Sequence, residues 1–426
     1  MRSLDIGIAG CGMAGLSAAL LLHRQGHRIT LYERFDEARP IGSGLMIQPT
    51  GMAVLSRLGL AQAVMAHGAQ IDGLLGLNNE GETVLEAAYA HLGLLGAFGL
   101  GIHRASLFET LFGAVQEQDI VTRAGREVKG TSLAKGGRTL DFDDGGTSPP
   151  HELIVDALGV GSPLVPPTDA VLPFGALWAT VDWPTGDVFD GRLLEQRYRR
   201  ADRMVGLLPV GEGKAAFFWS LRGDEHADWQ AEGMAAFRAE VCRLWPECEA
   251  IEPQLTESEQ LTFARYAHRT SAAATGERIV HVGDSWHAAS PQLGQGANMA
   301  LLDAWGLAQA IRESDDLEAA LRRYLALRAS HVRLYQWLTR AFTPPFQSNS
   351  IWPAVFRDLF MAPASRIPPG PRLKAHLVAG LVGAQLDRMD LPLPDYETLG
   401  LVSGASPAST ERASRTSSRA EALAQS

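Results

Sequence analysis

The chain has 426 residues, of which 46% are hydrophobic and 20% charged, a composition that suits a soluble globular protein with more than one domain. Its formal net charge of −10, without a dense run of Lys and Arg, argues against a nucleic-acid partner. The three cysteines, Cys11, Cys242 and Cys248, are too few and too scattered for a disulfide framework or a Cys-rich metal centre, and we find no other metal-ligand spacing.

The chain begins with the pattern of a βαβ unit. Residues 4–9 suit a buried strand, residues 13–25 have helical spacing, and residues 28–33 suit a second strand. The first strand carries Asp5 and leads straight into a glycine-rich turn, so we do not interpret it as a signal peptide. Because no stretch reaches about 18 uninterrupted apolar residues, no transmembrane helix is expected, and we expect a cytoplasmic protein.

The turn between the first strand and the helix is a GxGxxG motif, Gly10-Cys11-Gly12-Met13-Ala14-Gly15. Its first glycine permits a tight turn, the second lets the backbone approach a pyrophosphate, and the third lets the helix pack on the strand. Glu33 ends the second strand, where a carboxylate can accept hydrogen bonds from the ribose hydroxyls of an adenosine, and Arg34 follows it. The motif therefore predicts a bound dinucleotide, but it does not distinguish NAD from FAD.

The rest of the chain divides into further expected elements. They are a loop over 39–51, a helix over 51–67, short strands within 71–101, a helix over 104–117, a turn region over 138–150 and a strand over 152–157. Residues 174–222 alternate in polarity and are rich in Trp and Phe, which is typical of an antiparallel sheet. Then come a helix over 230–245, a strand over 278–282, long helices over 296–313 and 317–341, a proline-containing, loop-rich segment over 343–371 and a helix near 372–388.

A second motif spans residues 283–298. Asp284 follows a buried strand, where a carboxylate can hold a ribitol hydroxyl, and Pro291 fixes a turn. A helix then opens with the sequence Gly294-Gln295-Gly296-Ala297-Asn298. Its free N–H groups and the positive end of its dipole favour negative charge. Because a reduced flavin carries negative charge near N1 and O2, a helix N-terminus at this place favours flavin reduction.

The second motif resembles the GDxxHxxxPxxGQGxN signature of the para-hydroxybenzoate hydroxylase-like (class A) FAD-dependent monooxygenases, which include ubiquinone-biosynthesis hydroxylases. The resemblance covers most of residues 4–340, in the family's order. It implies an α/β fold, in which a Rossmann-like FAD-binding domain with a GxGxxG βαβ unit carries an inserted antiparallel β-sheet substrate domain and C-terminal helices.

The resemblance also implies roles for residues outside the two motifs. The stretch from His103 to Leu107 resembles an element whose arginine contacts the cofactor diphosphate, which assigns that role to Arg104. Val128 would offer its backbone to the adenine, although a plain strand residue is an equally good interpretation. Arg39 and the loop over 42–45 would flank the ribityl chain and the ring. The expected cofactor-binding residues are Gly10, Gly12, Ala14, Gly15, Glu33, Arg34, Arg39, Arg104, Val128, Asp284, Pro291, Gly294, Gly296, Ala297 and Asn298.

A third family signature, associated with both FAD and NAD(P)H use, is altered here. The matching stretch runs from Asp156 to Val165, with Leu158 where the family has an Asp and Val165 where it has an Arg. Losing a carboxylate acceptor puts direct use of NAD(P)H as the electron donor in doubt. Two hypotheses stay open at this point: a partner reductase supplies the electrons, or Asp156 provides the lost polar contact.

The expected domains follow from the motifs and the composition. Residues 1–172 and 263–340 are expected to form the FAD-binding domain, with 71–100 contributing to the substrate domain, which otherwise spans 173–262. Residues 341–400 are expected to be helical and 401–426 to be a disordered tail. The apolar, aromatic stretch 341–390 is expected to pack against the FAD domain. Hydrophobic-substrate access or peripheral membrane contact is the alternative.

The resemblance implies hydroxylation of a small aromatic or heteroaromatic substrate by O2 through a flavin C4a-hydroperoxide. The alternatives are another FAD oxidoreductase on this fold, such as a halogenase or a reductase, and a non-catalytic flavin-binding protein. The substrate wall is expected within 174–222 and 262–270, although each aromatic candidate there is more often a core residue. Those candidates are Trp178, Trp183, Phe217, Phe218, Trp219 and Tyr266. No catalytic acid or base can be assigned from the sequence, and neither can the substrate, the nicotinamide preference or the oligomeric state.

Overall fold

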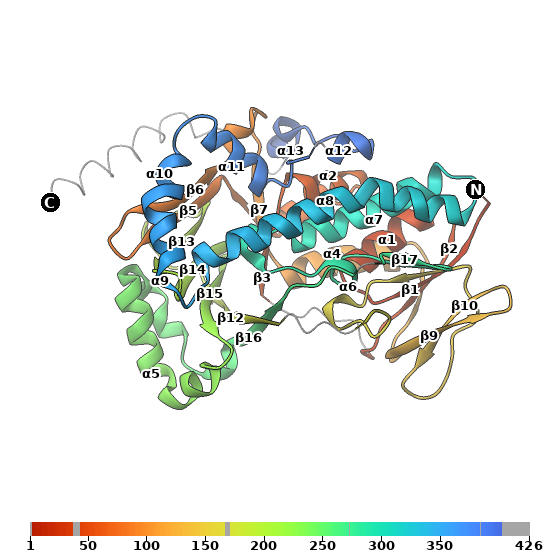
Figure 1. Cartoon of the computed structure of the whole chain (residues 1–426), viewed down its shortest axis with the longest axis horizontal. Helices are drawn as coiled ribbons and strands as arrows, with labels where there is room; N and C mark the ends of the chain where they lie inside the picture. The colour runs from red at the N-terminus through yellow and green to blue at the C-terminus, as the bar shows by residue number, and fades with distance from the viewer. Residues whose placement is uncertain (1, 37–42, 167–170, 272, 384, 403–426) are drawn as a thin grey trace.

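The computed structural model describes residues 2–36, 43–166, 171–271, 273–383 and 385–402. Two large sheets lie at opposite ends of the molecule, and the long helix α8 (Leu317–Phe346) runs from one end toward the other (Figure 1). This arrangement confirms the predicted α/β fold class. Arg39 and the tail beyond residue 402 lie outside the described residues.

The sheet at the N-terminal end contains, within the described residues, six strands in the order β17-β18-β11-β1-β2-β8. Its neighbours are parallel except β17 and β18. The strands are β1 (Asp5–Ala9), β2 (Arg28–Tyr32), β8 (Val121–Arg123), β11 (Leu153–Asp156), β17 (Thr275–Gly276) and β18 (Ile279–His281).

Helix α1 (Met13–Arg24) is central to the packing around this sheet. It buries every residue from Ala14 to Leu22, because α4 (Arg104–Gln116) and α7 (Gly296–Arg312) both pack on it. One apolar cluster contains side chains from β1, β2 and all three helices. Helices α1, α4 and α7 thus lie together around one sheet, although they are far apart in the sequence.

The second large sheet contains, in the part of the chain described, seven strands in the order β16-β12-β15-β14-β13-β5-β6. Its neighbours are antiparallel except β13 and β5. The strands are β5 (Gly73–Asn78), β6 (Thr83–Ala88), β12 (Val171–Asp182), β13 (Leu193–Arg199), β14 (Arg203–Gly211), β15 (Lys214–Arg222) and β16 (Thr262–Ala267). Helix α5 (His226–Leu244) packs on it, and Phe217 and Trp219 lie in the shared core.

Smaller elements complete the fold. A sheet of β3 (Gly44–Ile47), β7 (Gly99–His103) and β4 (Gly68–Ile71) lies beside α2 (Pro49–Arg57) and α3 (Ala61–Ala66), and β9 (Val128–Ala134) pairs with β10 (Gly137–Phe142). Short 3₁₀ helices span Tyr89–Leu92, Gly159–Gly161, Pro246–Ala250, Glu252–Gln254, Ser258–Gln260 and Pro291–Leu293. The remaining helices are α6 (Asp284–His287), α9 (Ile351–Phe356), a π-helical turn (Arg357–Met361), α10 (Ala362–Ala364), α11 (Gly370–Val378), α12 (Gln385–Arg388) and α13 (Tyr396–Val402).

Some expected elements were wrong. The stretch 343–371 is less rich in loops than expected and largely helical, because Pro353 lies in the first turn of α9, where a missing N–H breaks no helical bond. The turn region 138–150 contains β10, and the loop 39–51 contains β3 and the start of α2. The helix expected over 51–67 is two helices, separated at Gly59, which has a φ of 70°.

Candidate functional site

The glycine turn after β1 packs against the end of β11. Gly10 has a φ of 101° and donates its N–H to the Tyr32 carbonyl at 2.8 Å. A Cβ on Gly10 would lie 2.6 Å from the Ala157 carbonyl oxygen, and one on Gly15 would lie 2.0 Å from the Gly10 carbonyl oxygen. Both glycines are therefore required by close backbone approach, as the motif predicted for the turn and the helix packing.

Gly12 differs from these two glycines because the space above it is open. It is exposed, it precedes α1, and a Cβ placed on it would meet no atom within 4 Å. The first N–H groups of α1 have no partners within the helix, so this open space adjoins a helix N-terminus that favours an anion. A pyrophosphate fits this position.

The Glu33 carboxylate lies beside the same turn. Its Oε2 accepts the Cys11 N–H at 3.0 Å, and its Oε1 accepts the Arg34 N–H at 2.9 Å. These bonds hold the carboxylate at the end of β2, where it retains lone pairs for a ribose hydroxyl. The Arg34 guanidinium lies 4.6 Å from the centroid of the Phe35 ring. Burial raises the pKa of the Cys11 thiol to about 12, so this cysteine is not a reactive thiolate.

The second motif meets the first at Gly283. This residue has a φ of 61°, and a Cβ on it would lie 3.3 Å from the Ala300 Cβ and 3.4 Å from the Ala14 Cβ. The next residue, Asp284, begins α6; its side chain is open to solvent although protein surrounds it on most sides. Burial raises its pKa, and the nearby charges of His287 and Arg104 partly oppose that shift. Asp284 therefore lies in a recess near Arg104, the residue expected to contact the diphosphate.

Helix α7 begins at the other side of this recess. Pro291 starts a short 3₁₀ turn, Gly294 has a φ of 61°, and Gly296 is the first residue of α7. A Cβ on Gly296 would meet no atom within 4 Å, so the N-terminus of α7 also faces open space. The N–H groups of this first turn, to which Ala297 belongs, can stabilise a negatively charged ring.

The Asn298 side chain bonds within the protein, and its role as a cofactor ligand stays a prediction for the backbone of the α7 N-terminus. It is fully buried; its Oδ1 accepts the Gln48 N–H at 2.8 Å, and its Nδ2 donates to the Met46 carbonyl at 3.1 Å and to the Gly294 carbonyl at 3.0 Å. These bonds clamp the end of β3 to the start of α7. Only the backbone of Asn298 is left to face a cofactor.

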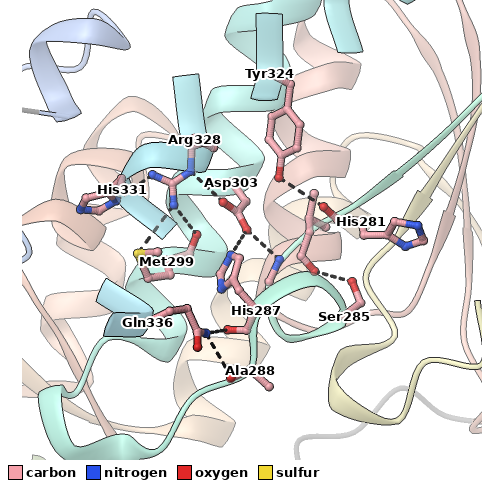
Figure 2. Close-up of polar contacts among 12 residues, drawn as sticks. His281, Ser285, His287, Ala288, Met299, Asp303, Tyr324, Arg328, His331 and Gln336 are labelled. Carbon is pink, nitrogen blue, oxygen red and sulfur yellow. Dashed lines mark hydrogen bonds and ion pairs between the residues drawn. The ribbon is translucent and has the colours of Figure 1, made fainter. Parts of the chain in front are cut away.

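A buried aspartate on α7 holds the second motif in place (Figure 2). Asp303 is fully buried; its Oδ2 accepts the Gly283 N–H at 2.8 Å and pairs with His287 Nε2 at 2.6 Å, while its Oδ1 accepts from Arg328 Nε at 2.7 Å. Burial alone would raise the pKa of this carboxyl, but the charges of His287 and Arg328 outweigh burial and lower it to about 2. Asp303 is thus a positioning residue for the Gly283–Asp284 turn, and sequence reasoning missed it.

The same network continues along α8. His331 Nδ1 lies 3.0 Å from Arg328 Nη1, and Gln336 donates to the His287 carbonyl at 3.0 Å (Figure 2). Burial and the Arg328 charge lower the pKa of His331 to about 3, so this imidazole is neutral in the folded protein at neutral pH. Helix α8 therefore anchors the second motif through Arg328 and Gln336.

We expect this network to make the protein sensitive to acid. His331 takes up a proton below its usual pKa of 6.5 when unfolded but only near 3 when folded, so the free energy of unfolding falls as pH drops through that window. Asp303 adds a further loss below its usual pKa of 3.8. The measurement is urea unfolding between pH 6.5 and pH 3. The free energy of unfolding should fall less steeply with decreasing pH in His331→Gln than in the native protein, by up to about 1.4 kcal/mol per pH unit. Identical slopes would show that His331 is not the group responsible.

The stretch with the altered family signature adjoins the glycine turn. The Asp156 carboxylate is fully buried; its Oδ1 accepts the Leu158 N–H at 3.1 Å, and its Oδ2 pairs with Ser162 Oγ and with His281 Nδ1, each at 2.7 Å. Both oxygens of this carboxylate are therefore already bonded to protein groups. Asp156 thus organises the turn that carries Leu158.

A cavity of about 540 Å³ lies between this turn and the seven-stranded sheet. It is lined by Val160, Gly161, Ser162, Pro163, Val165, Val171, Arg265, Tyr266, Ala267 and Arg269. Among the aromatic candidates, Tyr266 lines it, whereas Phe217 and Trp219 lie in the core under α5. Burial raises the pKa of the Tyr266 hydroxyl, so it is protonated at neutral pH.

Most of the residues expected to bind FAD thus lie in one region. The Gly10–Gly15 turn, Asp284 and the start of α7 converge around Gly283, and the positive charge of Arg104 acts on the Asp284 carboxyl. Val128 packs in an apolar cluster with Phe142 and with Tyr32, the last residue of β2, which Glu33 follows. An extended dinucleotide fits this arrangement. Gly12 and Gly296 leave open space at the N-termini of α1 and α7, and the carboxylates are those of Glu33 and Asp284.

Comparisons with known proteins agree with this geometry. The chain is 26% identical over 345 residues to an FAD-dependent urate hydroxylase from Klebsiella pneumoniae subsp. pneumoniae, which covers 76% of this chain and 86% of that one. It is 29% identical over 382 residues to kynurenine 3-monooxygenase from Stenotrophomonas maltophilia, with 78% and 77% covered. The structure of Klebsiella pneumoniae HpxO complexed with FAD and uric acid shares the fold, with a TM-score of 0.73 at 22% identity over 89% of this chain and 98% of that one.

The family comparison covers all three parts of the candidate site. The model described as FAD binding domain matches residues 3–132 and 151–334. These ranges include the glycine turn, Glu33, Arg104 and the whole second motif. The chain therefore belongs to the FAD binding domain family, and FAD is the cofactor of this site.

Proposed function

We propose that this protein is an FAD-dependent monooxygenase that hydroxylates a small aromatic or heteroaromatic compound. The observation that carries the proposal is the convergence of the glycine turn, the Asp284 recess and the N-terminus of α7, with a cavity between the neighbouring turn and the seven-stranded sheet. Relatives named FAD-dependent urate hydroxylase and kynurenine 3-monooxygenase support hydroxylation over the halogenase and reductase alternatives.

The roles of the protein groups follow from their positions. FAD, when bound, supplies the redox chemistry and the activation of oxygen. The open N-terminus of α7 would favour negative charge on the flavin ring, and Asp284 and Glu33 would hold hydroxyls of the cofactor. Tyr266 can donate a hydrogen bond to a substrate in the cavity.

Arg269 indicates the charge of the group that the cavity accepts. Its side chain is buried, yet its Nε and Nη1 have no hydrogen-bond acceptor in the described part of the chain. Two buried guanidinium N–H groups without an acceptor are costly, so a bound anionic group that accepts from them would be stabilised there. We therefore propose that carboxylated or otherwise anionic aromatic compounds are preferred over neutral ones.

The electron donor is a separate question. The Asp156 carboxylate is already bonded to Leu158 and Ser162 of its own turn and to His281 on β18, which gives little support to the hypothesis that it replaces the family aspartate at Leu158. We therefore propose a partner reductase as the electron source. Direct reduction by NADH or NADPH is the alternative.

One experiment tests the reaction and the donor. The purified protein should show the flavin absorption bands near about 370 and 450 nm. It is mixed anaerobically with NADH or NADPH, with and without anionic and neutral aromatic compounds, and then exposed to oxygen. A product heavier by one oxygen atom supports hydroxylation, and a halogenated product or no turnover with any electron source contradicts it. Fast bleaching by either nucleotide rejects the need for a partner reductase, and equal turnover of neutral compounds rejects the role of Arg269.

A further inference from the structure

The helical stretch 351–364 turns its apolar side chains toward solvent. Trp352 is 72% exposed, Phe356 55%, Leu359 65% and Phe360 62%. Their spacing follows one face of a helix, on which the Phe356 and Phe360 rings stack with centroids 5.9 Å apart. Water-soluble helices normally bury such a face, so this exposure needs an explanation.

The orientation of this stretch is fixed by a buried arginine on its inner face. Arg357 is fully buried; its Nη1 donates to the Arg200 carbonyl at 2.9 Å and to the Pro345 carbonyl at 3.0 Å. Its guanidinium also lies 5.1 Å from the centroid of the Tyr198 ring. Rotating the helix to bury its aromatic face would break these contacts, so the aromatic face stays outside.

The apolar surface continues onto the next helical segment. Ile367 is 67% exposed and Leu373, on α11, is 60% exposed. We call the exposed apolar residues of this region the α9–α11 surface; they are Ile351, Trp352, Val355, Phe356, Leu359, Phe360, Ile367 and Leu373. Helices α9, α10 and α11 lie together at the end of the molecule opposite β9 and β10 (Figure 1).

The chain segment that carries this surface is rich in Lys and Arg, while the neighbouring strand β6, on which α10 and α11 pack, contributes Glu86. Residues 333–376 contain six Lys and Arg residues and one acid, Asp358, in a chain whose net charge is −10. Asp358 pairs with Arg357 at 2.6 Å, and Glu86 lies near Lys374. Four exposed arginines then remain that no described carboxylate pairs with: Arg333, Arg340, Arg366 and Arg372.

We propose that the α9–α11 surface docks on an anionic lipid bilayer, with its aromatic and aliphatic side chains in the headgroup region. Exposed Trp and Phe beside arginines are suited to that region, because the rings enter the interface and the cations contact lipid phosphates. Within the described residues, no helix is long and apolar enough to span a bilayer, so the contact is peripheral. This inference does not depend on the proposed reaction.

Two other occupants fit the surface less well. A symmetric dimer would place the same arginine-rich surface on both sides of the contact, so that like charges face each other. The chain beyond residue 402 has Leu423 as its one large apolar residue, which is too little to cover eight exposed apolar side chains. A bilayer satisfies both the apolar face and the charge.

The test is co-sedimentation of the FAD-loaded, full-length protein with two kinds of vesicle. One is phosphatidylcholine alone, and the other is an equal mixture of phosphatidylcholine and phosphatidylglycerol. We expect binding to the mixed vesicles that weakens with added salt. Replacing Trp352, Phe356 and Phe360 together with Ser should lower the partition coefficient by roughly tenfold or more, as should the pair Arg366→Glu and Arg372→Glu.

The control is Leu133→Ser, which removes an exposed leucine on β9, at the other end of the molecule (Figure 1). It should bind like the native protein, and the flavin spectrum of each variant reports whether it folds. Equal binding to both vesicles, or binding that survives all the substitutions, overturns the proposal. The absence of vesicle binding also overturns it. If the variants then change the oligomeric state, the surface contacts a second copy of this chain; if they do not, its partner is an acidic protein.

Discussion

Gly12→Val is expected to abolish FAD binding while leaving the fold intact. Gly12 has a φ of −75° and a ψ of −179°, a conformation that valine adopts without strain, and a Cβ there meets no protein atom within 4 Å. The added isopropyl group would instead occupy the space in front of the α1 N-terminus, where the pyrophosphate approaches. We expect FAD affinity to fall by roughly a hundredfold or more, which corresponds to about 2.7 kcal/mol.

The measurement is the dissociation constant of FAD, followed by quenching of flavin fluorescence as the apoprotein is titrated. Gly113→Val is the matched control, because Gly113 lies on α4 and a Cβ on it also meets no atom within 4 Å. It should retain native affinity. Tight FAD binding by Gly12→Val would show that the cofactor diphosphate does not pass over this turn.

Asp303→Ala is expected to give the largest loss of stability. Asp303, Arg328 and His287 are all buried, and the aspartate is the acceptor that both partners share. Removing it leaves the fully buried Arg328 guanidinium without its counter-charge, which typically costs about 3–5 kcal/mol. It also releases the Gly283 N–H, so the turn that carries Asp284 loses an anchor.

Equilibrium denaturation of the apoprotein measures this effect. The informative comparison is the double variant Asp303→Leu with Arg328→Met, which removes both charges and restores apolar volume. We expect it to be more stable than Asp303→Ala, because no unpaired charge stays buried. Equal destabilisation of the two variants would mean that packing, rather than the unpaired charge, accounts for the loss.

The residues of the candidate site that could be predicted from sequence are those whose role depends on local backbone conformation. The glycine turn, Glu33 at the end of a strand, and the glycines that open α7 are short-range patterns, and the structure places them where a dinucleotide fits. Their roles as cofactor ligands stay predictions until FAD binding is measured on variants.

Other roles were hidden because they depend on contacts between distant segments. Asp303 and Arg328 lie on two different helices, and each alone looks like an ordinary charged helical residue. Asn298 is in the motif, yet its side chain bonds to Met46 and Gln48 rather than facing the recess. Whether Asp156 could replace the missing family aspartate also required knowing that its carboxylate is already used by Ser162 and His281.

The sequence by itself determined the cofactor class and the α/β architecture, because glycines at turns and the periodicity of strands and helices act over a few residues. Only the tertiary structure decided which polar groups are buried together and which apolar face stays outside. Residues 341–390 were expected to pack against the FAD domain, and Leu377, Leu386 and Met389 do lie in its apolar cluster, whereas the stretch 351–364 exposes its aromatic face. Buried contacts of Arg357 with distant carbonyls hold this stretch in that orientation, and such contacts form only when separate parts of the chain come together.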